Sequence, residues 1–368
     1  MLIIGYFCAA IMGGARLVRR AALIDKATLS KLLRGGDILM PTLTLVQAEV
    51  LMVRTLTRCR TSIDNARSVA RALIAAEMDG LKGHGLSRVP MYAEQAKVRK
   101  IDGTFKPLAT QPRPGLMAID AGHGFAFPAI ELAEAELPAM ARRQGIAAAA
   151  IRKSSHCGAA GHPVERLADK GLVALMLVNT PGAIAPWGGS KAAFGTNPVA
   201  FACPLPGREP LVIDLSLSKV ARGNVMMAKQ RGEQIPDGWA LDKDGKPTTD
   251  PDAALRGTML PMGDAKGVAL ALMVELLAAG LTGANFAAEA SSYLDSYGSP
   301  SGTGQLILAF DPAAFGGDAP SRFGILAASI EAQPGARLPG MRRLKAREKA
   351  KAEGLTISEK LMAEIEAA

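Results

Sequence analysis

The chain has 368 residues, of which 49% are hydrophobic, 21% charged and only 4% aromatic, and its formal net charge is +9. These values indicate a globular protein with one or two cores of mainly aliphatic side chains, and they exclude a disordered or collagen-like chain. The positive charge is concentrated in residues 1–39 and 337–351. With no basic stripe across the body and few rings on which bases could stack, the chain is not expected to bind nucleic acid.

The first 39 residues differ in character from the rest. Residues 1–12 are apolar but shorter than the roughly 20 residues that span a bilayer. Basic residues follow this apolar run, whereas in a secretory signal they precede it. We expect residues 1–39 to be an extension outside the fold, and a membrane or targeting segment is the alternative.

The cysteine pattern bears on the cellular compartment. The four cysteines are widely scattered and form no CxxC pair; they are Cys8, Cys59, Cys157 and Cys203. This spacing predicts neither a disulfide framework nor a metal site, and it favours a cytoplasmic protein. We expect no membrane partner, because the apolar run of residues 1–12 is too short to span a bilayer.

In the first half of the body, periodicity predicts helices and strands in alternation. Apolar residues recur at helical spacing from Leu45 to Asp79, which predicts two packed helices ending at Gly80, and a further helix restarts near Leu86. The segments expected next are a strand and turn at 116–127, a long helix at 127–145 closed by Gly145, a strand at 146–155, and a glycine-bearing loop with a helix at 156–171.

The second half adds more strand candidates and ends in helix. The segments expected are strands at 172–180, 200–205 and 210–218, a surface loop at 238–251, a buried helix at 267–281, strands at 306–312 and 324–330, and a charged helical tail at 342–368. The pattern predicts an α/β protein whose N- and C-terminal helices pack together. We assign residues 40–120 with 335–368 to a helical domain, and 121–334 to an α/β domain that binds cofactor and substrate.

Histidines are the first candidates for proton transfer near neutral pH. The chain has four, His84, His123, His156 and His162. His84 lies between two glycines, which leave its imidazole approachable by a ligand. Arg88, four residues later, would lie on the same side of a helix and could hold a carboxylate through two hydrogen bonds. The pair predicts a carboxylic-acid site, with an ordinary surface His–Arg pair as the alternative.

The segment from His156 to His162 is the second candidate. Its small residues follow an apolar strand, so backbone N–H groups could approach a phosphate or a nicotinamide carboxamide; the alternative is an ordinary strand-to-helix turn. His162 is expected to border the following helix, and His123 to lie in a glycine turn without chemistry. A Rossmann GxGxxG, a GxxxxGK[ST] loop, HxxxH metal spacing and a GxSxG elbow are all missing.

Seven stretches, taken together and in order, carry a family resemblance. They are residues 83–92, 153–162, 186–198, 213–225, 235–251, 263–267 and 334–343. The chain thereby resembles the type-2 malate/L-lactate dehydrogenase family. The resemblance implies a non-Rossmann α/β fold with a mixed sheet flanked by helices, NADPH or else NADH as cofactor with NADPH preferred, a small anionic carboxylic acid as substrate, and a homodimer with the cofactor near the subunit interface.

The resemblance also implies roles for individual residues. His84, as proton donor, and Asn224 occupy catalytic positions. The substrate-binding positions are Arg88, Thr196, Arg222 and Gly223. The cofactor-binding positions are His156, Cys157, Gly158, Ala159, Ala160, Asp214, Leu215, Ser216, Lys266, Gly298, Gly302, Thr303 and Gly304.

Two positions depart from the imine-reducing branch of that family. Gly83 and Asn224 stand where the branch has a serine and an aspartate that relay charge to the histidine. A neutral amide cannot stabilise an imidazolium as a carboxylate does, so another carboxylate such as Asp214 would have to reach His84.

Three functions follow from these observations. We expect NAD(P)-dependent hydride transfer at carbon 2 of a small 2-oxo or 2-hydroxy acid. The alternative is reduction of a cyclic imino acid, Δ1-pyrroline-2-carboxylate or Δ1-piperideine-2-carboxylate, to proline or pipecolate. A third hypothesis is a dimer that binds the cofactor but is catalytically silent.

Overall fold

The computed structural model describes residues 41–368. The prediction that residues 1–39 form an extension outside the fold therefore concerns residues outside the described part. Within residues 41–368, no helix has the length and apolar character needed to cross a bilayer, and no cluster of three potential metal-ligating side chains is found.

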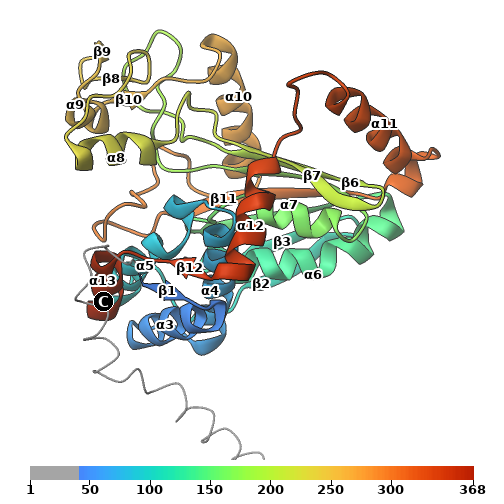
Figure 1. Cartoon of the computed structure of the whole chain (residues 1–368), viewed down its shortest axis with the longest axis horizontal. Helices are drawn as coiled ribbons and strands as arrows, with labels where there is room; N and C mark the ends of the chain where they lie inside the picture. The colour runs from blue at the N-terminus through green and yellow to red at the C-terminus, as the bar shows by residue number, and fades with distance from the viewer. Residues whose placement is uncertain (1–40) are drawn as a thin grey trace, which may run out of the picture. The chain divides into compact units, whose positions relative to one another are not determined.

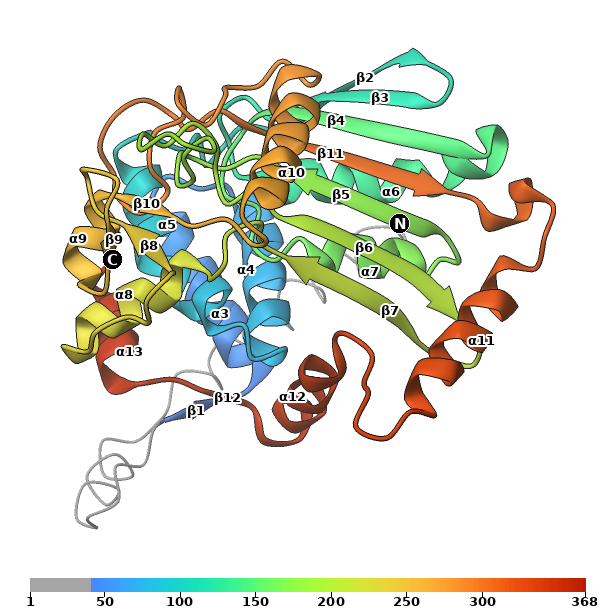
Figure 2. The ribbon, with the colours of Figure 1, turned by 90° about the horizontal axis from the view of Figure 1, so that it is seen from above.

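The central element of the fold is a sheet of seven strands. In their order across the sheet these are β2 (Leu108–Arg113), β3 (Leu116–Asp120), β4 (Ile146–Ser154), β11 (Thr303–Phe310), β5 (Val173–Val178), β6 (Val199–Leu205) and β7 (Arg208–Leu215). β3 and β4 run parallel, and all other neighbouring pairs are antiparallel. Figure 2 shows β11 lying between β4 and β5, so the last strand of the sheet in sequence completes its centre. The predicted mixed sheet is confirmed.

Helices cover both faces of this sheet. α6 (Ala126–Gln144) and α7 (Gly161–Ala168) pack on one face, and α10 (Ala265–Glu275) with the short helix η3 (Leu276–Gly280) packs on the other (Figure 2). Along β4, the side chains of Ala147 and Ala149 belong to the core between the sheet and helices α6 and α7. Those of Ala148 and Ala150 pack against the core between the sheet and α10. The predicted aliphatic core therefore exists as two alanine-rich layers.

Helices from the two ends of the described chain pack together in one layer. Its elements are α3 (Leu45–Arg58), α4 (Ile63–Met78), α5 (Val89–Lys97), α12 (Met341–Glu353) and α13 (Glu359–Ala367), with the two-stranded pair β1 (Thr42–Leu43) and β12 (Leu355–Thr356). Thr44 and Gln47 form a capping box that starts α3. Leu56, Leu73 and Ile365 belong to one buried core, which confirms that N- and C-terminal helices pack together (Figure 1).

Several predictions of local structure are wrong. Residues 324–330, expected as a strand, lie in helix α11 (Ala319–Glu331), because Asp318 caps its N-terminus and a proline stands in its first turn. The tail is not one helical run, since β12 interrupts it to pair with β1. β2 was not predicted, because all six of its residues are exposed and show no apolar pattern.

The lobe on the α10 side also differs from expectation. The loop expected at 238–251 contains two short strands of a small sheet, and the helix expected to be buried at 267–281 exposes one apolar face, with Leu276 54% exposed. The elements of this lobe are α8 (Arg222–Arg231), α9 (Pro251–Arg256) and the three-stranded sheet β10 (Thr258–Met259), β8 (Ala240–Leu241) and β9 (Pro247–Thr248). These strands have only two residues each and lie among polar turn residues, so no alternating apolar pattern indicated them.

Candidate active site

Glu77, near the end of α4, shapes the segment that carries His84. Its side chain is buried, one oxygen accepts a hydrogen bond from the Leu86 backbone N–H at 2.9 Å, and the other pairs with the Lys82 ammonium. A Cβ on Gly85 would lie 2.0 Å from the Glu77 Oε2 atom, so this glycine is required by the fold. A Cβ on Gly83 would meet nothing within 4 Å, so this second glycine is not required by packing.

His84 and Arg88 lie on two successive turns of 3-10 helix, η1 (Lys82–His84) and η2 (Leu86–Arg88), instead of the continuous helix that the spacing suggested. The Arg88 Nε atom donates a hydrogen bond to the Gly83 carbonyl oxygen at 2.6 Å, which fixes the guanidinium beside the His84 segment. Its two terminal nitrogens make no hydrogen bond or ion pair with the described residues. They are available to an anionic ligand.

The structure brings two of the predicted site residues into contact. The rings of His84 and His156 stack in parallel, with centroids 5.3 Å apart and an interplanar angle of 5°. The His84 Nδ1 atom is buried and has no hydrogen-bond partner among residues 41–368. Burial, and then the positive charge of Arg88 and the proximity of His162, lower the pKa of His84 to about 4. Within residues 41–368, no carboxylate, Asp214 included, makes a hydrogen bond or ion pair with this imidazole.

His156 is held by two tyrosines that the sequence analysis did not single out. The Tyr92 hydroxyl oxygen lies 2.6 Å from His156 Nδ1, and the Tyr293 ring meets His156 edge-on with centroids 5.2 Å apart. Burial lowers the pKa of His156 well below its usual value. The position of Tyr92 within the 83–92 stretch, four residues after Arg88, was the available signal; Tyr293 gave none.

A second group of predicted residues lines a cleft of about 740 Å³. Ala159, Asp214 and Leu215 are in its wall. The Asp214 Oδ2 atom accepts a hydrogen bond from the Gly161 backbone N–H at 2.8 Å, and burial raises the pKa of this carboxyl group. The opposite wall comes from residues 337–343, which lie within the recognised stretch 334–343 to which no role was assigned, and from Ala346 beyond it.

The chemistry of this cleft fits a phosphorylated dinucleotide. Its volume lies within the roughly 300–1,000 Å³ of small-molecule sites. Three arginines are among the residues that line it, Arg337, Arg342 and Arg343, and the buried Arg343 Nε atom has no hydrogen-bond partner among the described residues. Arginine forks match phosphate oxygens in geometry and charge. The cleft therefore has both the room and the donors that a dinucleotide requires.

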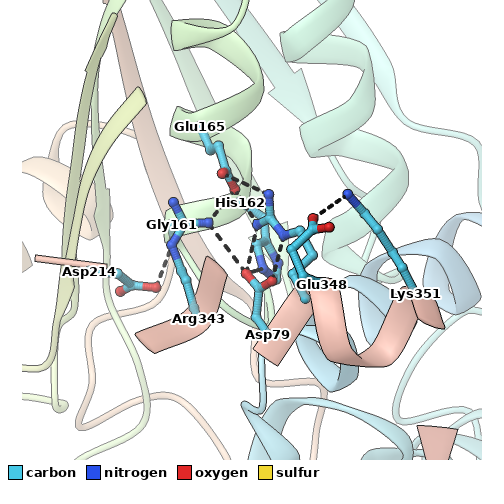
Figure 3. Close-up of polar contacts among 9 residues, drawn as sticks. Asp79, Gly161, His162, Glu165, Asp214, Arg343, Glu348 and Lys351 are labelled. Atoms are coloured by element: carbon cyan, nitrogen blue, oxygen red, sulfur yellow. Dashed lines mark hydrogen bonds and ion pairs between the residues drawn. The ribbon is translucent and has the colours of Figure 1, made fainter. Parts of the chain in front are cut away.

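A buried ion network holds the C-terminal wall of the cleft in place (Figure 3). Arg347, on α12, bonds Asp79 at the end of α4 at 2.7 Å and Glu165 on α7 at 2.9 Å. His162, in the first turn of α7 as predicted, lies 3.0 Å from Asp79, and Arg343 bonds Glu165 at 2.6 Å. Burial alone would raise the pKa of Asp79, but hydrogen bonds from His162 and Arg347 hold it well below its usual value. Buried ion pairs thus link α4, α7 and α12 at the edge of the cleft.

The remaining residues of the 156–160 loop lie beside these groups. Cys157 is buried, and burial raises the pKa of its thiol to about 12, so it is not a thiolate near neutral pH. Gly158 has a φ of +71°, which glycine adopts without strain, and its Cβ would approach the Phe127 ring at 3.0 Å. Ala160 is part of the core against α6.

The predicted residues of the middle segments fall into separate groups. The Thr196 carbonyl oxygen accepts a hydrogen bond from the Ser216 hydroxyl at 3.4 Å, so a predicted substrate residue and a predicted cofactor residue touch. Arg222 donates to the Leu255 carbonyl oxygen at 2.9 Å. Gly223 and Asn224 are exposed on α8. Nothing in the described part of the chain connects Asn224 with His84.

The last predicted cofactor residues do not line the cleft. Lys266 is exposed in the first turn of α10, and Gly298 is exposed in the loop before β11. Gly302, Thr303 and Gly304 are buried at the start of β11. The Thr303 hydroxyl lies 2.5 Å from that of Tyr293, which places this segment next to the His156 pair.

Comparison with known proteins shows the family to which the chain belongs. The family model for malate/L-lactate dehydrogenase matches residues 43–366, and the chain belongs to this family. It is 49% identical to the (2R)-3-sulfolactate dehydrogenase (NADP(+)) of Chromohalobacter salexigens, over 88% of this chain and 97% of that protein. It is 38% identical to the Delta(1)-pyrroline-2-carboxylate reductase of Ancylobacter novellus, over 88% of this chain and 96% of that protein.

A solved structure gives the same result. The delta1-piperideine-2-carboxylate reductase of Pseudomonas syringae pvar. tomato matches with a TM-score of 0.84 and 36% identity, covering 89% of this chain and 99% of that one. The predicted family and its non-Rossmann α/β fold are confirmed, and the chain is an NAD(P)-dependent oxidoreductase, as predicted.

Proposed function

We propose that the protein transfers a hydride reversibly between NADP and carbon 2 of a small 2-oxo or 2-hydroxy acid, with His84 exchanging the proton and Arg88 binding the carboxylate. The observation that carries this proposal is the pairing of a partly buried imidazole with a guanidinium whose terminal nitrogens are free, held together by the 2.6 Å bond from Arg88 to Gly83. The 49% identity to a sulfolactate dehydrogenase supports a hydroxy acid as substrate.

His84 is neutral in the unliganded protein near pH 7, because its pKa is lowered to about 4. A neutral imidazole can accept the proton of a hydroxyl group, and Nε2 is the atom we assign to this step because Nδ1 is buried. A carboxylate bound to Arg88 would offset the positive charge that disfavours the imidazolium. Binding of the acid thus makes His84 easier to protonate at the moment when the proton must move.

We propose that the cofactor lies along the cleft, held by the 156–160 loop, by Asp214, Leu215 and Ser216, and by the arginines of residues 337–343. The bound nicotinamide supplies or accepts the hydride. Lys266, Gly298, Gly302, Thr303 and Gly304 remain predicted cofactor contacts, and Thr196, Arg222 and Gly223 predicted substrate contacts. Asn224, exposed on α8, keeps the predicted catalytic position without a contact that supports it.

A panel of substrates tests the function. NADPH oxidation is followed with pyruvate, oxaloacetate, 3-sulfopyruvate and Δ1-pyrroline-2-carboxylate. The sulfonate is included because a relative of 49% identity is a sulfolactate dehydrogenase. Turnover of a 2-oxo acid supports the proposal, and the absence of turnover with all three contradicts it.

Reduction of a cyclic imino acid is the second candidate, supported by the 38% identity to a pyrroline-2-carboxylate reductase. The geometry of this chain favours it less, because residue 83 is a glycine without a side chain and no carboxylate in the described part of the chain makes a hydrogen bond with His84. Faster turnover of Δ1-pyrroline-2-carboxylate than of any 2-oxo acid would reverse this order.

The substitution Arg88→Lys should raise the KM for the acid by about 10- to 100-fold with a smaller effect on kcat. The expected loss of binding free energy is that of one charge-assisted hydrogen bond, about 1.5–3 kcal/mol. An ammonium cannot bind both carboxylate oxygens in the geometry of an arginine. Steady-state kinetics measure it. The matched control is Arg99→Lys, an exposed arginine beyond α5, which should leave KM unchanged. Equal KM values for both variants would remove Arg88 from substrate binding.

The pH profile should reveal the lowered pKa of His84. In oxidation of the hydroxy acid, kcat/KM reports the free enzyme, and its acid limb should lie near pH 4 instead of near the usual histidine value of 6.5. Between these two values the unfolded chain binds a proton that the folded chain does not, so this histidine makes the fold less stable as pH falls. A limb at pH 6.5 or above would contradict the assignment.

The homodimer and the cytoplasmic location are also part of this proposal. An apolar face of α10 and η3 is 42–54% exposed at Leu270, Leu272, Met273 and Leu276, and such a face supports association with a second copy. Light scattering of the purified chain would detect the dimer. Cys59, Cys157 and Cys203 are free thiols, which suits a reducing compartment.

A further inference from the structure

His156 is enclosed by groups from three separate segments. The His84 ring covers its face, the Tyr92 hydroxyl lies 2.6 Å from its Nδ1 atom, and the Tyr293 ring meets it edge-on. Such enclosure fixes the plane of the imidazole. It also fixes the plane of His84, which is parallel to it within 5°.

The hydrogen bond between Tyr92 and His156 has one satisfactory direction. Tyr92 is only 1% exposed, and His156 Nδ1 is the sole hydrogen-bond partner of its hydroxyl among residues 41–368. If Nδ1 carried the proton, the hydroxyl hydrogen would be buried without an acceptor, at a cost that folded proteins avoid. The phenol therefore donates, Nδ1 accepts, and the single ring proton of His156 lies on Nε2.

α5 holds both tyrosines against His156. It carries Tyr92 itself, and the Gln95 Nε2 atom donates to the Asp295 carbonyl oxygen at 2.7 Å. Just beyond the helix, the buried Lys100 ammonium donates to the carbonyl oxygens of Ser292 at 2.8 Å and Tyr297 at 2.6 Å. The segment that carries Tyr293 is thus tied to the same helix as Tyr92.

We propose that Tyr92 is a positioning residue for proton transfer: its hydroxyl holds His156 in the neutral Nε2–H tautomer, stacked on His84, so that His84 alone exchanges the proton. This inference rests on the proposed role of His84. A charged His156 would lie 5.3 Å from the His84 ring and would oppose its protonation. The titratable and charged groups that face the pair are Arg88, Tyr92, Cys157, His162 and Tyr293.

The substitution Tyr92→Phe removes the hydroxyl and keeps the ring, which packs against Phe125 and Phe127. The matched control is Tyr297→Phe, the same change at a residue that is 80% exposed. Since the chain has four histidines, nitrogen NMR of the full chain with ¹⁵N-labelled histidine gives few signals to assign. In the wild type and in Tyr297→Phe, His156 should show the Nε2–H pattern. In Tyr92→Phe, its two nitrogens should shift toward the average of both tautomers.

Kinetics with NADPH and either pyruvate or 3-sulfopyruvate give the second readout. Tyr92→Phe should lower kcat about 3- to 10-fold, the size of one neutral hydrogen bond, with KM unchanged. The basic limb of the reductive pH profile should move to lower pH, because a His156 that is easier to protonate makes charging of His84 more costly.

Three results would overturn the proposal: an Nδ1–H tautomer in the wild type, NMR signals of His156 that do not change in Tyr92→Phe, or a tautomer change with kcat and pH profile equal to those of Tyr297→Phe. A wild type that turns over neither acid contradicts the proposed function instead. The NMR measurement on the unliganded protein decides the tautomer in that case as well.

Discussion

Replacing His84 by alanine should lower kcat for reduction of the 2-oxo acid by about 10²- to 10⁴-fold, the usual effect of removing a positioned acid or base. We assign the proton transfer to this imidazole because it lies beside the Arg88 guanidinium, while the Cys157 thiol keeps its proton and no carboxylate of residues 41–368 makes a hydrogen bond with the ring. NADPH binding, measured by fluorescence titration, should change far less than kcat, because His84 does not line the cleft proposed to hold the cofactor.

The matched control for this variant is His123→Asn. His123 lies in a turn with a φ of +60°, a conformation that asparagine tolerates well, and within residues 41–368 no hydrogen bond or ring stacking joins it to His156 or Arg88. Its kcat should equal that of the wild type. A His84→Ala variant as active as His123→Asn would assign the proton transfer to another group and would remove the basis of the proposed mechanism.

The second large effect concerns stability. Arg347→Met should lower the free energy of unfolding by about 3–5 kcal/mol, because it removes the arginine that bonds both Asp79, whose side chain is fully buried, and Glu165. Urea denaturation extrapolated to zero denaturant measures it. The variant should also bind NADPH more weakly, since the network anchors α12 at the wall of the cleft (Figure 3).

Arg71→Met serves as the control for this prediction. Arg71 and Glu131 form an ion pair of similar geometry, but their side chains are 54% and 38% exposed. Exposed pairs contribute only about 0–1 kcal/mol, since water and salt screen them. Equal losses in the two variants would show that burial does not decide the strength of these ion pairs.

Structural features that depend on a few neighbouring residues could be predicted from the sequence. The long helix α6 ends at Gly145, which has a φ of +79°, as its position after the periodic segment indicated. The alanine-rich strand β4 and the spacing of His84 and Arg88 could be recognised in the same way. The prediction of a strand at residues 324–330 was wrong because a short apolar run suits a strand or a helix equally. The residue that decides for a helix, the N-cap Asp318, lies outside the run.

Contacts between distant segments were not predictable from periodicity. Tyr293 reaches His156 only because Gln95 and Lys100 hold its loop, and no local pattern around residue 293 indicates this. The pairing of Arg347 with Asp79 likewise joins the two ends of the described chain. Family resemblance named residues for the cofactor, but it did not distinguish Ala159 and Asp214, which line the cleft, from Lys266, which does not.

The sequence by itself determined the family, the aliphatic composition of the core, most helices, and the imidazole–guanidinium pair, because each is written in residue types at short and regular spacing. Only the tertiary structure decided that β11 completes the centre of the sheet, that His84 stacks on His156, and that arginines from the C-terminal segment face Asp214 across the cleft. The physical reason is that these arrangements depend on burial and on the pairing of groups far apart in the chain, and such energies arise only when the whole fold has formed.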